Sequence, residues 1–372
     1  MKITSIETLP VLVPIQPEFV IKGALGIHSE SPFVLLRVHT DEGITGLGEV
    51  SCTPVWSGED NVTSIHVIRN FLEPALKGED PRDIERLTAK MRRAVFGHPF
   101  TKSGLEIAFW DILGKASGQP VYRLLGGAVR DRIPIKMSVS GASPERASQI
   151  AEWALAKGLS ALKVKVGIEP QADIERVAAV RKVVGPKFRV GIDANGGWSV
   201  RVAIQCIRRI VEESNVFFAE QPVSAVNLDW LTEVRRNVSV PVMADESCNT
   251  PQDAIAIVRA GAADILSAYV GKGGGIGPAR KVTAIAEAAG LTCTVGSNLE
   301  LGVASAAMAH LAASSPGVGA EDFPCDILGP LGYAHDMLAN PIEYRDGAVY
   351  VPQGPGLGVE LDDKLIAKYR VT

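Results

Sequence analysis

The sequence predicts an α/β fold: a modified (β/α)8-type TIM barrel that follows an α+β capping domain. From residue 133 onward, short apolar segments alternate with amphipathic helical segments at a spacing of about 25 residues, which is typical of a parallel barrel. The earlier part of the chain groups its strands before its helices. A doubly wound open sheet is the competing interpretation, because a pattern of strands alone does not close a barrel.

The capping domain is expected over residues 1–125. Its first strands are predicted at 2–14, 32–40 and 44–50. The segments 16–30 and 51–58 are rich in Gly, Pro and Ser, and we predict two loops there that could cover a site. Helical periodicity then follows at 65–76, 84–96 and 103–116.

The barrel is expected over residues 126–324. Its strands are predicted at 133–140, 161–167, 189–193, 216–222, 242–245, 264–269, 291–295 and, with the weakest pattern, 319–323. Residues 325–372 are predicted to form a C-terminal segment that contains a strand at 342–351 and returns to the capping domain.

The composition indicates a protein that binds neither nucleic acid nor membranes. The chain of 372 residues has a formal net charge of -4 and a pI of 5.9, which gives no electrostatic attraction to polyanions. No apolar run is long enough to span a bilayer. The five cysteines form no C-x-x-C pair and the N-terminus lacks a signal-peptide pattern, so we expect reduced thiols and a cytoplasmic location.

Two lysines lie inside one of the apolar strands. Lys163 and Lys165 are two residues apart and therefore face the same side of the strand. Neighbouring ammonium groups repel, so each lowers the pKa of the other, and a lysine with a lowered pKa can act as a base near neutral pH. A buried lysine pair also requires negatively charged partners.

Each of the next three strands ends in an acid: Asp193, Glu220 and Asp245. In a barrel, equivalent positions on successive strands are neighbours at the C-terminal rim, where active sites lie. Three converging carboxylates repel unless a cation joins them, and an all-oxygen ligand set favours Mg²⁺. An acid at a strand end can also cap the following helix, but three in register after the lysine pair favour a metal site.

These residues resemble the Lys-x-Lys and Asp/Glu/Asp set of the enolase superfamily, in its muconate-lactonizing, muconate cycloisomerase-like subgroup. The resemblance covers nearly the whole chain: residues 110–115 and 124–127 resemble the helix and turn that lead into the barrel of that family, and 354–358 resembles its C-terminal return. It implies Mg²⁺, with Mn²⁺ as a possible substitute, held by the three acids. It also implies a small carboxylate substrate and a homo-oligomer.

The resemblance further implies a mechanism. The metal binds the substrate carboxylate, Lys165 removes the proton on the α-carbon, and Lys163 orients the substrate and keeps the pKa of Lys165 low. The metal stabilises the enediolate that results. In lactonization, Lys165 would instead protonate the enediolate carbon.

One position departs from the pattern of the family. Many relatives carry a second lysine at the end of the sixth strand, on the opposite face of the substrate, and here Tyr269 occupies that position. Tyr269 could donate a proton or only shape the pocket. Lys272 could reach the site if its loop folds inward, or could bond nearby carbonyls or a carboxylate. The departure weakens a two-base racemase and favours a one-base reaction.

Further substrate-binding candidates follow from their positions near the lysines and acids. Asn195 lies two residues after Asp193 on the same face, although it could equally be a turn residue. His28 and Trp56 lie on the two predicted covering loops, and neither needs a direct role. Glu246 is left out of the metal set, because its side chain should point away if its strand continues.

The ends of the last two predicted strands supply the remaining candidates, Ser297, Asn298, Glu300 and Asp322. The loop after the seventh strand faces the substrate by resemblance, although Asn298 could instead cap the helix near residue 302. Asp322 could bind a cationic group of the substrate or serve as a cap.

We therefore predict an Mg²⁺-dependent isomerase or lyase that removes the proton α to a carboxylate of a small organic acid. The preferred outcomes are cycloisomerization and β-elimination by a dehydratase. The alternative is racemization or epimerization of an amino-acid or proline derivative, with Lys165 on one face and Tyr269 or Lys272 on the other. A barrel that only binds a ligand is a second alternative, against which the complete lysine and acid set argues.

Overall fold

The computed structural model describes residues 1–371, and its largest sheet is parallel and curled. The order of its strands is β13-β12-β11-β10-β9-β8-β7, with parallel pairing between neighbours. These strands are β7 (Met137–Val139), β8 (Ala161–Lys165), β9 (Arg189–Asp193), β10 (Ala219–Glu220), β11 (Val242–Ala244), β12 (Ile265–Ala268) and β13 (Thr292–Val295).

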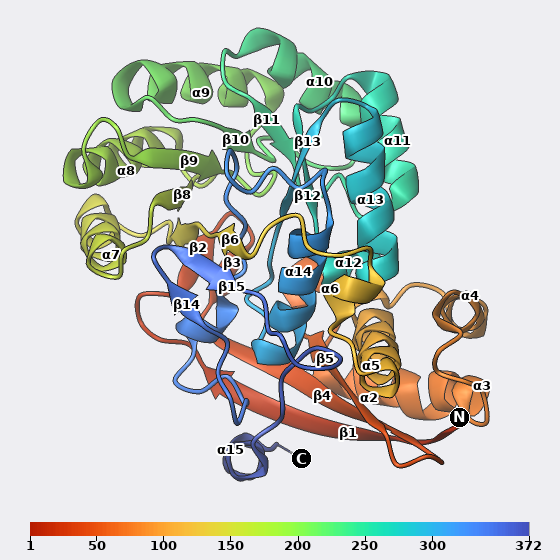
Figure 1. The fold of residues 1–372 in the computed structure, drawn as a ribbon. Coiled ribbons are helices and arrows are strands. Elements are labelled where there is room, and N and C mark those ends of the chain that lie inside the picture. Colours follow the sequence, from red (N-terminus) through yellow and green to blue (C-terminus); the bar gives the residue numbers. More distant parts are fainter. Residues whose placement is uncertain (372) are drawn as a thin grey trace.

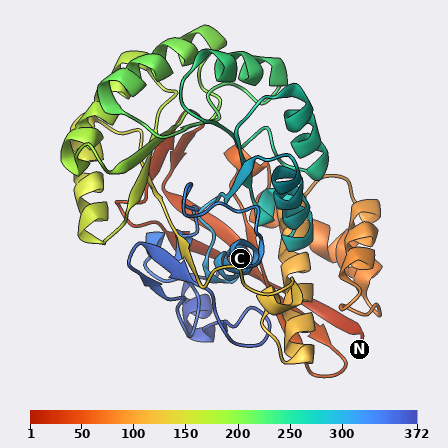
Figure 2. The same ribbon diagram turned by 45° about the horizontal axis from the view of Figure 1, so that its top comes forward.

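Helices alternate with these strands and form an arc outside the sheet (Figure 1 and, turned by 45°, Figure 2). They are α7 (Pro144–Ala156), α8 (Pro170–Val184), α9 (Val200–Ser214), α10 (Leu228–Asn237), α11 (Pro251–Ala260) and α13 (Ile276–Ala288). Four of them begin at a residue whose side chain accepts a backbone N–H of the first turn, which stabilises the helix start. These residues are Ser143, Glu169, Asn227 and Thr250.

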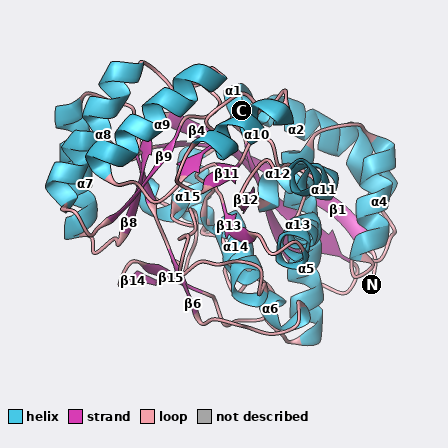
Figure 3. Ribbon diagram, turned by 90° about the horizontal axis from the view of Figure 1, so that it is seen from above, coloured by secondary structure: helices cyan, strands magenta, loops and turns pink. Residues whose placement is uncertain are grey.

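The helix α14 (Gly302–Ser314) differs from the outer helices because every one of its residues is buried. Its sequence is apolar on all sides, and such a helix is stable only inside a protein. It packs against β5 (Thr45–Ser51) of the capping domain as well as against α13. In Figure 3, the view from above, α14 lies inside the arc of outer helices.

The eighth strand predicted at 319–323 does not form. The chain turns there instead, because the backbone N–H groups of Asp322 and Phe323 both donate to the carbonyl of Gly319, at 3.1 and 2.8 Å. The prediction was wrong because Pro316, Gly317 and Pro324 surround this segment and Gly319 begins it, and these residues weaken its strand pattern.

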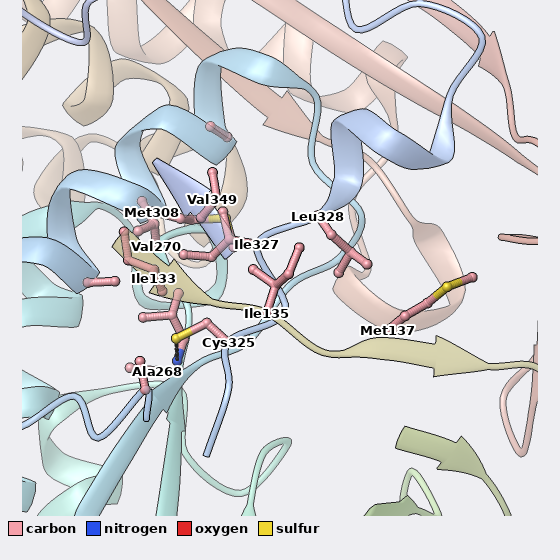
Figure 4. Packing of buried hydrophobic residues seen from close by; sticks show 14 of the residues in the cluster. Ile133, Ile135, Met137, Ala268, Val270, Met308, Cys325, Ile327, Leu328 and Val349 are labelled. Carbon is pink, nitrogen blue, oxygen red and sulfur yellow. Dashed lines mark hydrogen bonds between the residues drawn. The ribbon is translucent and has the colours of Figure 1, made fainter. Parts of the chain in front are cut away.

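Isolated bridges close the barrel in place of a regular eighth strand. One edge strand is joined to the segment through Cys293 and Val318, and the other edge is joined through Ile135 and Cys325. Apolar side chains fill the seam, among them Ile135, Cys325, Ile327 and Leu328 (Figure 4). The barrel is therefore a modified one, with segment 318–326 in the eighth position.

In the capping domain the three predicted strands form an antiparallel sheet, in the order β1-β4-β5. Its strands are β1 (Ile3–Pro14), β4 (Glu30–Thr40) and β5. Its helices are α2 (Asn61–Val67), α3 (Glu73–Leu76), α4 (Ile84–Ala94), α5 (Pro99–Ser117) and α6 (Val121–Leu124), with a π-helical turn at Ile68–Leu72. With this domain and the closed sheet, the predicted fold class is confirmed.

The two predicted covering loops each contain a short regular element. The first holds a β-hairpin of β2 (Ile21–Gly23) and β3 (Gly26–His28), and the second holds α1 (Pro54–Ser57). We call these two elements the lid. The hairpin is attached to the barrel, because the N–H of Gly141 donates to the carbonyl of Lys22 at 2.7 Å.

The C-terminal segment contacts both domains. The strand β15 (Ala348–Tyr350) pairs with β14 (Tyr344–Arg345) and with β6 (Arg132–Pro134), so the predicted strand 133–140 is divided between this sheet and β7. Farther on, α15 (Asp363–Tyr369) lies against β1. Asp111 of α5 joins the parts, because its carboxylate accepts the N–H groups of Leu47 and Leu357, both at 2.8 Å.

Two features bear on the expectations about membranes and thiols. Among residues 1–371, no helix is both long enough and apolar enough to cross a bilayer. The five cysteines are free and buried. Burial raises the pKa of Cys52 and of Cys248 to about 12, so these thiols stay protonated and unreactive.

Candidate active site

Strand register places the lysines and acids at one rim of the barrel. Lys165 pairs with Asp193 across β8 and β9, and Asp193 pairs with Glu220 across β9 and β10. Glu220 in turn pairs with Met243, and Asp245 lies two residues beyond it, on the same side of the chain. The three acids are each 1% exposed, so the spacing in the sequence correctly predicted their convergence.

An apolar layer fills the barrel beneath the acids. Phe218, Met243 and Ile265 form a separate buried cluster there, and the first two of these precede Glu220 and Asp245 by two residues. The neighbouring position on β9 is Gly191, where a Cβ atom would lie 2.2 Å from the ring of Phe218. The layer therefore leaves the polar side chains together at the top of the barrel.

Lys163 is held by three carboxylates. Its Nζ lies 3.0 Å from Oε1 of Glu220, 3.4 Å from Oδ2 of Asp326 and 3.5 Å from Oδ2 of Asp193. Burial by itself lowers the pKa of Lys163, but the three acids outweigh it and raise the pKa well above its usual value. The expectation that its neighbour lowers the pKa of Lys163 was therefore wrong, and this side chain is a fixed positive charge.

Lys165 lies beside a carboxylate and an amide. Its Nζ donates to Oδ2 of Asp193 at 2.6 Å and to Oδ1 of Asn195 at 2.8 Å. Asn195 has a left-handed backbone with φ of 43°, which asparagine tolerates better than most residues, and its N–H donates to Asp193 at 2.9 Å. This turn aims the amide of Asn195 at Lys165.

The rim opens into a pocket that encloses about 120 Å³. Its floor carries Lys163, Lys165, Asn195, Asp245 and Tyr269. Its walls come from the lid and the last two barrel loops, with His28, Trp56, Ser297, Asn298 and Asp326 among their residues. The structure therefore brings most of the predicted substrate-binding candidates to one small cavity.

Tyr269 faces Lys165 across the floor of the pocket, because β12 and β8 lie four positions apart in a barrel of eight. Its hydroxyl donates to Oδ2 of Asp245 at 3.0 Å, and its ring stacks on Trp56 with the ring centres 5.2 Å apart. Burial and the charge of Asp245 raise the pKa of Tyr269 well above its usual value. A Cβ atom at Gly296 would lie 1.7 Å from this ring, so the glycine makes room for it.

Lys272 folds inward from the short helix α12 (Val270–Gly273). Its Nζ donates to the carbonyl of Asp245 at 2.6 Å, forms an ion pair with Oδ1 of the same residue and lies 4.2 Å from the ring centre of Tyr269. It lines a neighbouring groove rather than the pocket. The contacts of Lys272 are therefore those of the second sequence interpretation, in which this lysine bonds a nearby carbonyl and a carboxylate.

The loop after β13 joins the barrel to the capping domain. The side-chain amide of Asn298 donates to Ser51 at 3.2 Å and to Thr53 at 3.0 Å. Glu300 does not line the pocket, and its carboxylate instead accepts the hydroxyl of Ser297 at 2.5 Å and the N–H of Asn298 at 3.0 Å. Glu300 therefore shapes this loop.

The helix after this loop is capped from the other domain. Glu49 of β5 accepts the N–H groups of Leu301 and Ala304 at the start of α14, at 2.7 and 3.0 Å. The alternative in which Asn298 caps this helix is therefore wrong.

The prediction that Asp322 lies at the rim was also wrong. Asp322 is exposed, and its carbonyl accepts a hydrogen bond from Arg189, which begins β9 at the opposite end of the barrel. Because the chain turns at 319–323 and rejoins the barrel later, Asp326 takes the expected position. Asp326 is 5% exposed and lines the pocket.

The sequence interpretation missed Lys136, which is 0% exposed. Its Nζ lies 2.8 Å from Oδ2 of Asp326 and donates to the carbonyl of Pro324 at 2.7 Å. The sequence does contain a signal for it, because Lys136 lies within the apolar segment 133–140 just as Lys163 lies within the apolar segment 161–167. Asp326 is therefore fixed between two lysines.

Glu246 was set aside because it should point away from the site, and the structure places it toward the site. The strand β11 ends at Ala244, so the alternation that would turn Glu246 away does not apply. Oε1 of Gln221 accepts the N–H groups of Asp245 and Ser247, at 2.9 and 3.2 Å, and bends the loop. As a result Glu246 accepts the amide of Asn195 at 2.9 Å.

The three acids could hold a divalent cation. Oε2 of Glu220 is buried without a hydrogen-bond partner, and burial together with the neighbouring acids raises the pKa of Glu220 to about 8, so the cluster gains from added positive charge. In the described chain no three acid, His or Cys side chains lie close enough to ligate one ion as they stand. Each acid instead forms an ion pair with a lysine: Glu220 with Lys163, Asp193 with Lys165 and Asp245 with Lys272.

Comparisons with known proteins cover almost the whole chain. Residues 4–126 match the model of the mandelate racemase/muconate lactonizing enzyme N-terminal domain, and 145–365 match the enolase C-terminal domain-like model. The chain is 36% identical over 370 residues to muconate cycloisomerase 1 of Rhodococcus opacus, covering 97% of this chain and 96% of that protein.

The similar proteins also include a racemase. The chain is 33% identical over 371 residues to N-succinyl-L-Arg/Lys racemase of Bacillus cereus, covering 100% of this chain and 98% of that protein. Among solved structures, 2-chloromuconate cycloisomerase of Rhodococcus opacus superposes with a TM-score of 0.95 at 34% identity and full coverage of both chains.

Proposed function

The chain belongs to the enolase superfamily, in the mandelate racemase/muconate lactonizing enzyme group, and we propose that it removes the α-proton of a small carboxylate with Lys165 as the base. The observation that carries this proposal is the position of Lys165 in the pocket, opposite Tyr269 and beside Asp193. The outcome that we favour is β-elimination or cycloisomerization through an enediolate.

We propose that Asp193, Glu220 and Asp245 hold Mg²⁺. When bound, this ion would neutralise the negative charge that develops on the substrate carboxylate. The fixed charge of Lys163, which lies beside Lys165 on the floor of the pocket, supports orientation of the same carboxylate.

The contacts of Tyr269 favour a reaction with one base. Its proton is donated to Asp245 and its pKa is raised, so it is a poor acceptor for a proton from the substrate. Lys272 forms an ion pair with Asp245, and its Nζ lies against the ring of Tyr269. Lys165 is then the one amine in the described residues that both lines the pocket and is partly exposed, with 12% of its side chain accessible.

Racemization is the second candidate, because the chain is as similar to the racemase of Bacillus cereus as to several cycloisomerases. It would require Tyr269 to return a proton on the face opposite Lys165. The positions of β8 and β12 on opposite sides of the barrel support that geometry.

Incubation of candidate acids with the protein and Mg²⁺ in deuterated water separates these outcomes. In the one-base reaction, either the α-proton is lost together with a leaving group, or ring closure adds a deuteron from the solvent at the α-carbon, and no inverted substrate accumulates. Tyr269→Phe, which keeps the ring stacked on Trp56, should lower kcat by less than about tenfold. Inverted, deuterated substrate together with a loss of about 10²-fold or more in Tyr269→Phe would establish the racemase instead.

A further inference from the structure

We propose that Glu246 is a positioning residue for Lys165 and that it acts through Asn195. The proposal rests on the proposed function, in which Lys165 is the base. Two hydrogen bonds join the three side chains: Nδ2 of Asn195 donates to Oε1 of Glu246 at 2.9 Å, and Nζ of Lys165 donates to Oδ1 of Asn195 at 2.8 Å. Glu246 thereby reaches the predicted base without touching it.

The chemistry of an amide explains why Glu246 matters. The side chain of Asn195 has an acceptor at one end and a donor at the other, whereas an ammonium group only donates and a carboxylate only accepts. One orientation of the amide satisfies both neighbours. If Glu246 is removed, the backbone bond from Asn195 to Asp193 still holds the turn, but nothing in that bond decides which end of the amide faces Lys165.

Among the described residues, the side-chain oxygen of Asn195 accepts a hydrogen bond from Lys165 alone. The other acceptor of Lys165 is Asp193, which lies 3.5 Å from Lys163 and is a proposed metal ligand. Because Asp193 is shared among several cations, Asn195 is the neighbour that keeps the amine in one place. A base must be held within hydrogen-bond reach of the proton that it removes.

A structural role for the Glu246 side chain does not account for its contacts. Its Oε2 is buried without a partner among the described residues, and such a group is costly to bury. The direction of the loop is set by Gln221 and by the bond from the N–H of Cys248 to the carbonyl of Asp245. A substitution at Glu246 should therefore leave the loop and Asp245 in place.

The test is a double-mutant cycle between Glu246 and Asn195, measured on α-proton removal in the presence of Mg²⁺. We expect Glu246→Ala to lower kcat about 10- to 100-fold, the loss that misplacement of a reacting group produces. KM and the Kd for Mg²⁺ should change by less than about threefold, since neither the substrate nor Mg²⁺ contacts Glu246 in this proposal. Glu246→Gln should retain most of the activity, because its amide oxygen still accepts from Asn195.

The cycle also shows whether the two residues act together. In the Asn195→Ala background, Glu246→Ala should have less than about a twofold further effect, since the residue through which it acts is absent. If the decreases in kcat caused by the two single substitutions multiply in the double mutant, the proposal is overturned. A large rise in the Kd for Mg²⁺ in Glu246→Ala would also overturn it.

A crystal structure of Glu246→Ala supplies a result that needs no substrate. We expect the amide of Asn195 to lie farther than 3.5 Å from Nζ of Lys165, or to turn its nitrogen toward it. An Asn195 that keeps its contact unchanged would contradict the proposal. If the wild-type protein removed no α-proton from any acid while Asn195 moved as expected, the proposed function would fail and the link between Glu246 and Asn195 would stand.

Discussion

The floor of the pocket and its lid are held in different ways. On the floor, Lys163 is 3% exposed and Asp245 is 1% exposed, and both are fixed by ion pairs. On the lid, Ile27 and Val55 line the same pocket but are 67% and 68% exposed and carry no charge. Buried charges with several partners are held rigidly, whereas exposed apolar side chains can adjust. The difference suggests that the floor decides the reaction and the lid decides which acid enters.

The largest expected effect is on the floor. Lys165→Met removes the proposed base and should lower kcat by about 10²- to 10⁴-fold, the usual contribution of a general base. Steady-state kinetics would be compared with Lys364→Met, a substitution of an exposed lysine on α15. A Lys165→Met enzyme with a rate near that of the wild type would remove Lys165 from the mechanism.

The second prediction tests the proposed metal site and requires no substrate. Mg²⁺ at 100 times its Kd should stabilise the wild-type protein by about 2.7 kcal/mol, seen as a rise in Tm that a chelator reverses. Glu220→Gln should lose most of this rise, because one proposed ligand becomes neutral. Glu212→Gln, at an exposed position on α9, is the control, and an equal Tm rise in Glu220→Gln would contradict the metal site.

The third prediction concerns the scaffold that holds floor and lid together. His310 of α14 is 0% exposed. One ring nitrogen faces the N–H of Tyr122 at 3.3 Å and the other faces the carbonyl of Leu357 at 3.1 Å, so the neutral ring fits both partners. Burial lowers the pKa of His310 from 6.5 to about 4.

The unfolded chain therefore binds more protons than the native protein between pH 6.5 and 4. By linkage, the free energy of unfolding should fall on acidification across this window, by an amount on the order of 3 kcal/mol for this residue. Urea denaturation at several pH values, compared with His310→Gln, measures it. A wild-type slope no steeper than that of His310→Gln would contradict this account.

The smallest effect is expected on the lid. Ile27→Ser removes apolar contact with a bound acid, a loss on the order of 1 kcal/mol, so KM should rise about fivefold while kcat stays nearly constant. Val62→Ser, at a position on α2 that is 70% exposed and does not line the pocket, is the matched control. If Ile27→Ser lowered kcat as much as Lys165→Met does, the proposed difference between the roles of floor and lid would be wrong.

Family, fold class and the class of enzyme were predictable from the sequence and are confirmed by the comparisons. The reason is that Lys163-Val164-Lys165 and the three strand-end acids are local signals, each readable from a strand and its end. The individual roles of these residues, and the boundaries of the domains, stay predictions that the experiments above address.

The errors at Asp322 and Glu246 have a common physical cause. Both predictions assumed that a strand continues to the residue concerned, and in both places the chain turns earlier. The turn at 319–323 is made by its own backbone bonds, and the turn at Asp245 is made by Gln221, which comes from the neighbouring strand end. A contact of the second kind is invisible in a pattern of residues along the chain.

The sequence by itself determined the order of strands and helices, the lysine pair and the spacing that brings Asp193, Glu220 and Asp245 to one rim. These features depend on hydrophobic periodicity, which is a property of neighbouring residues. Tertiary structure alone decided that Asp326 rather than Asp322 joins the site, that Lys272 folds inward and that Glu246 reaches Asn195. Those outcomes depend on hydrogen bonds and ion pairs between segments far apart in the chain, whose geometry is fixed only when the barrel closes.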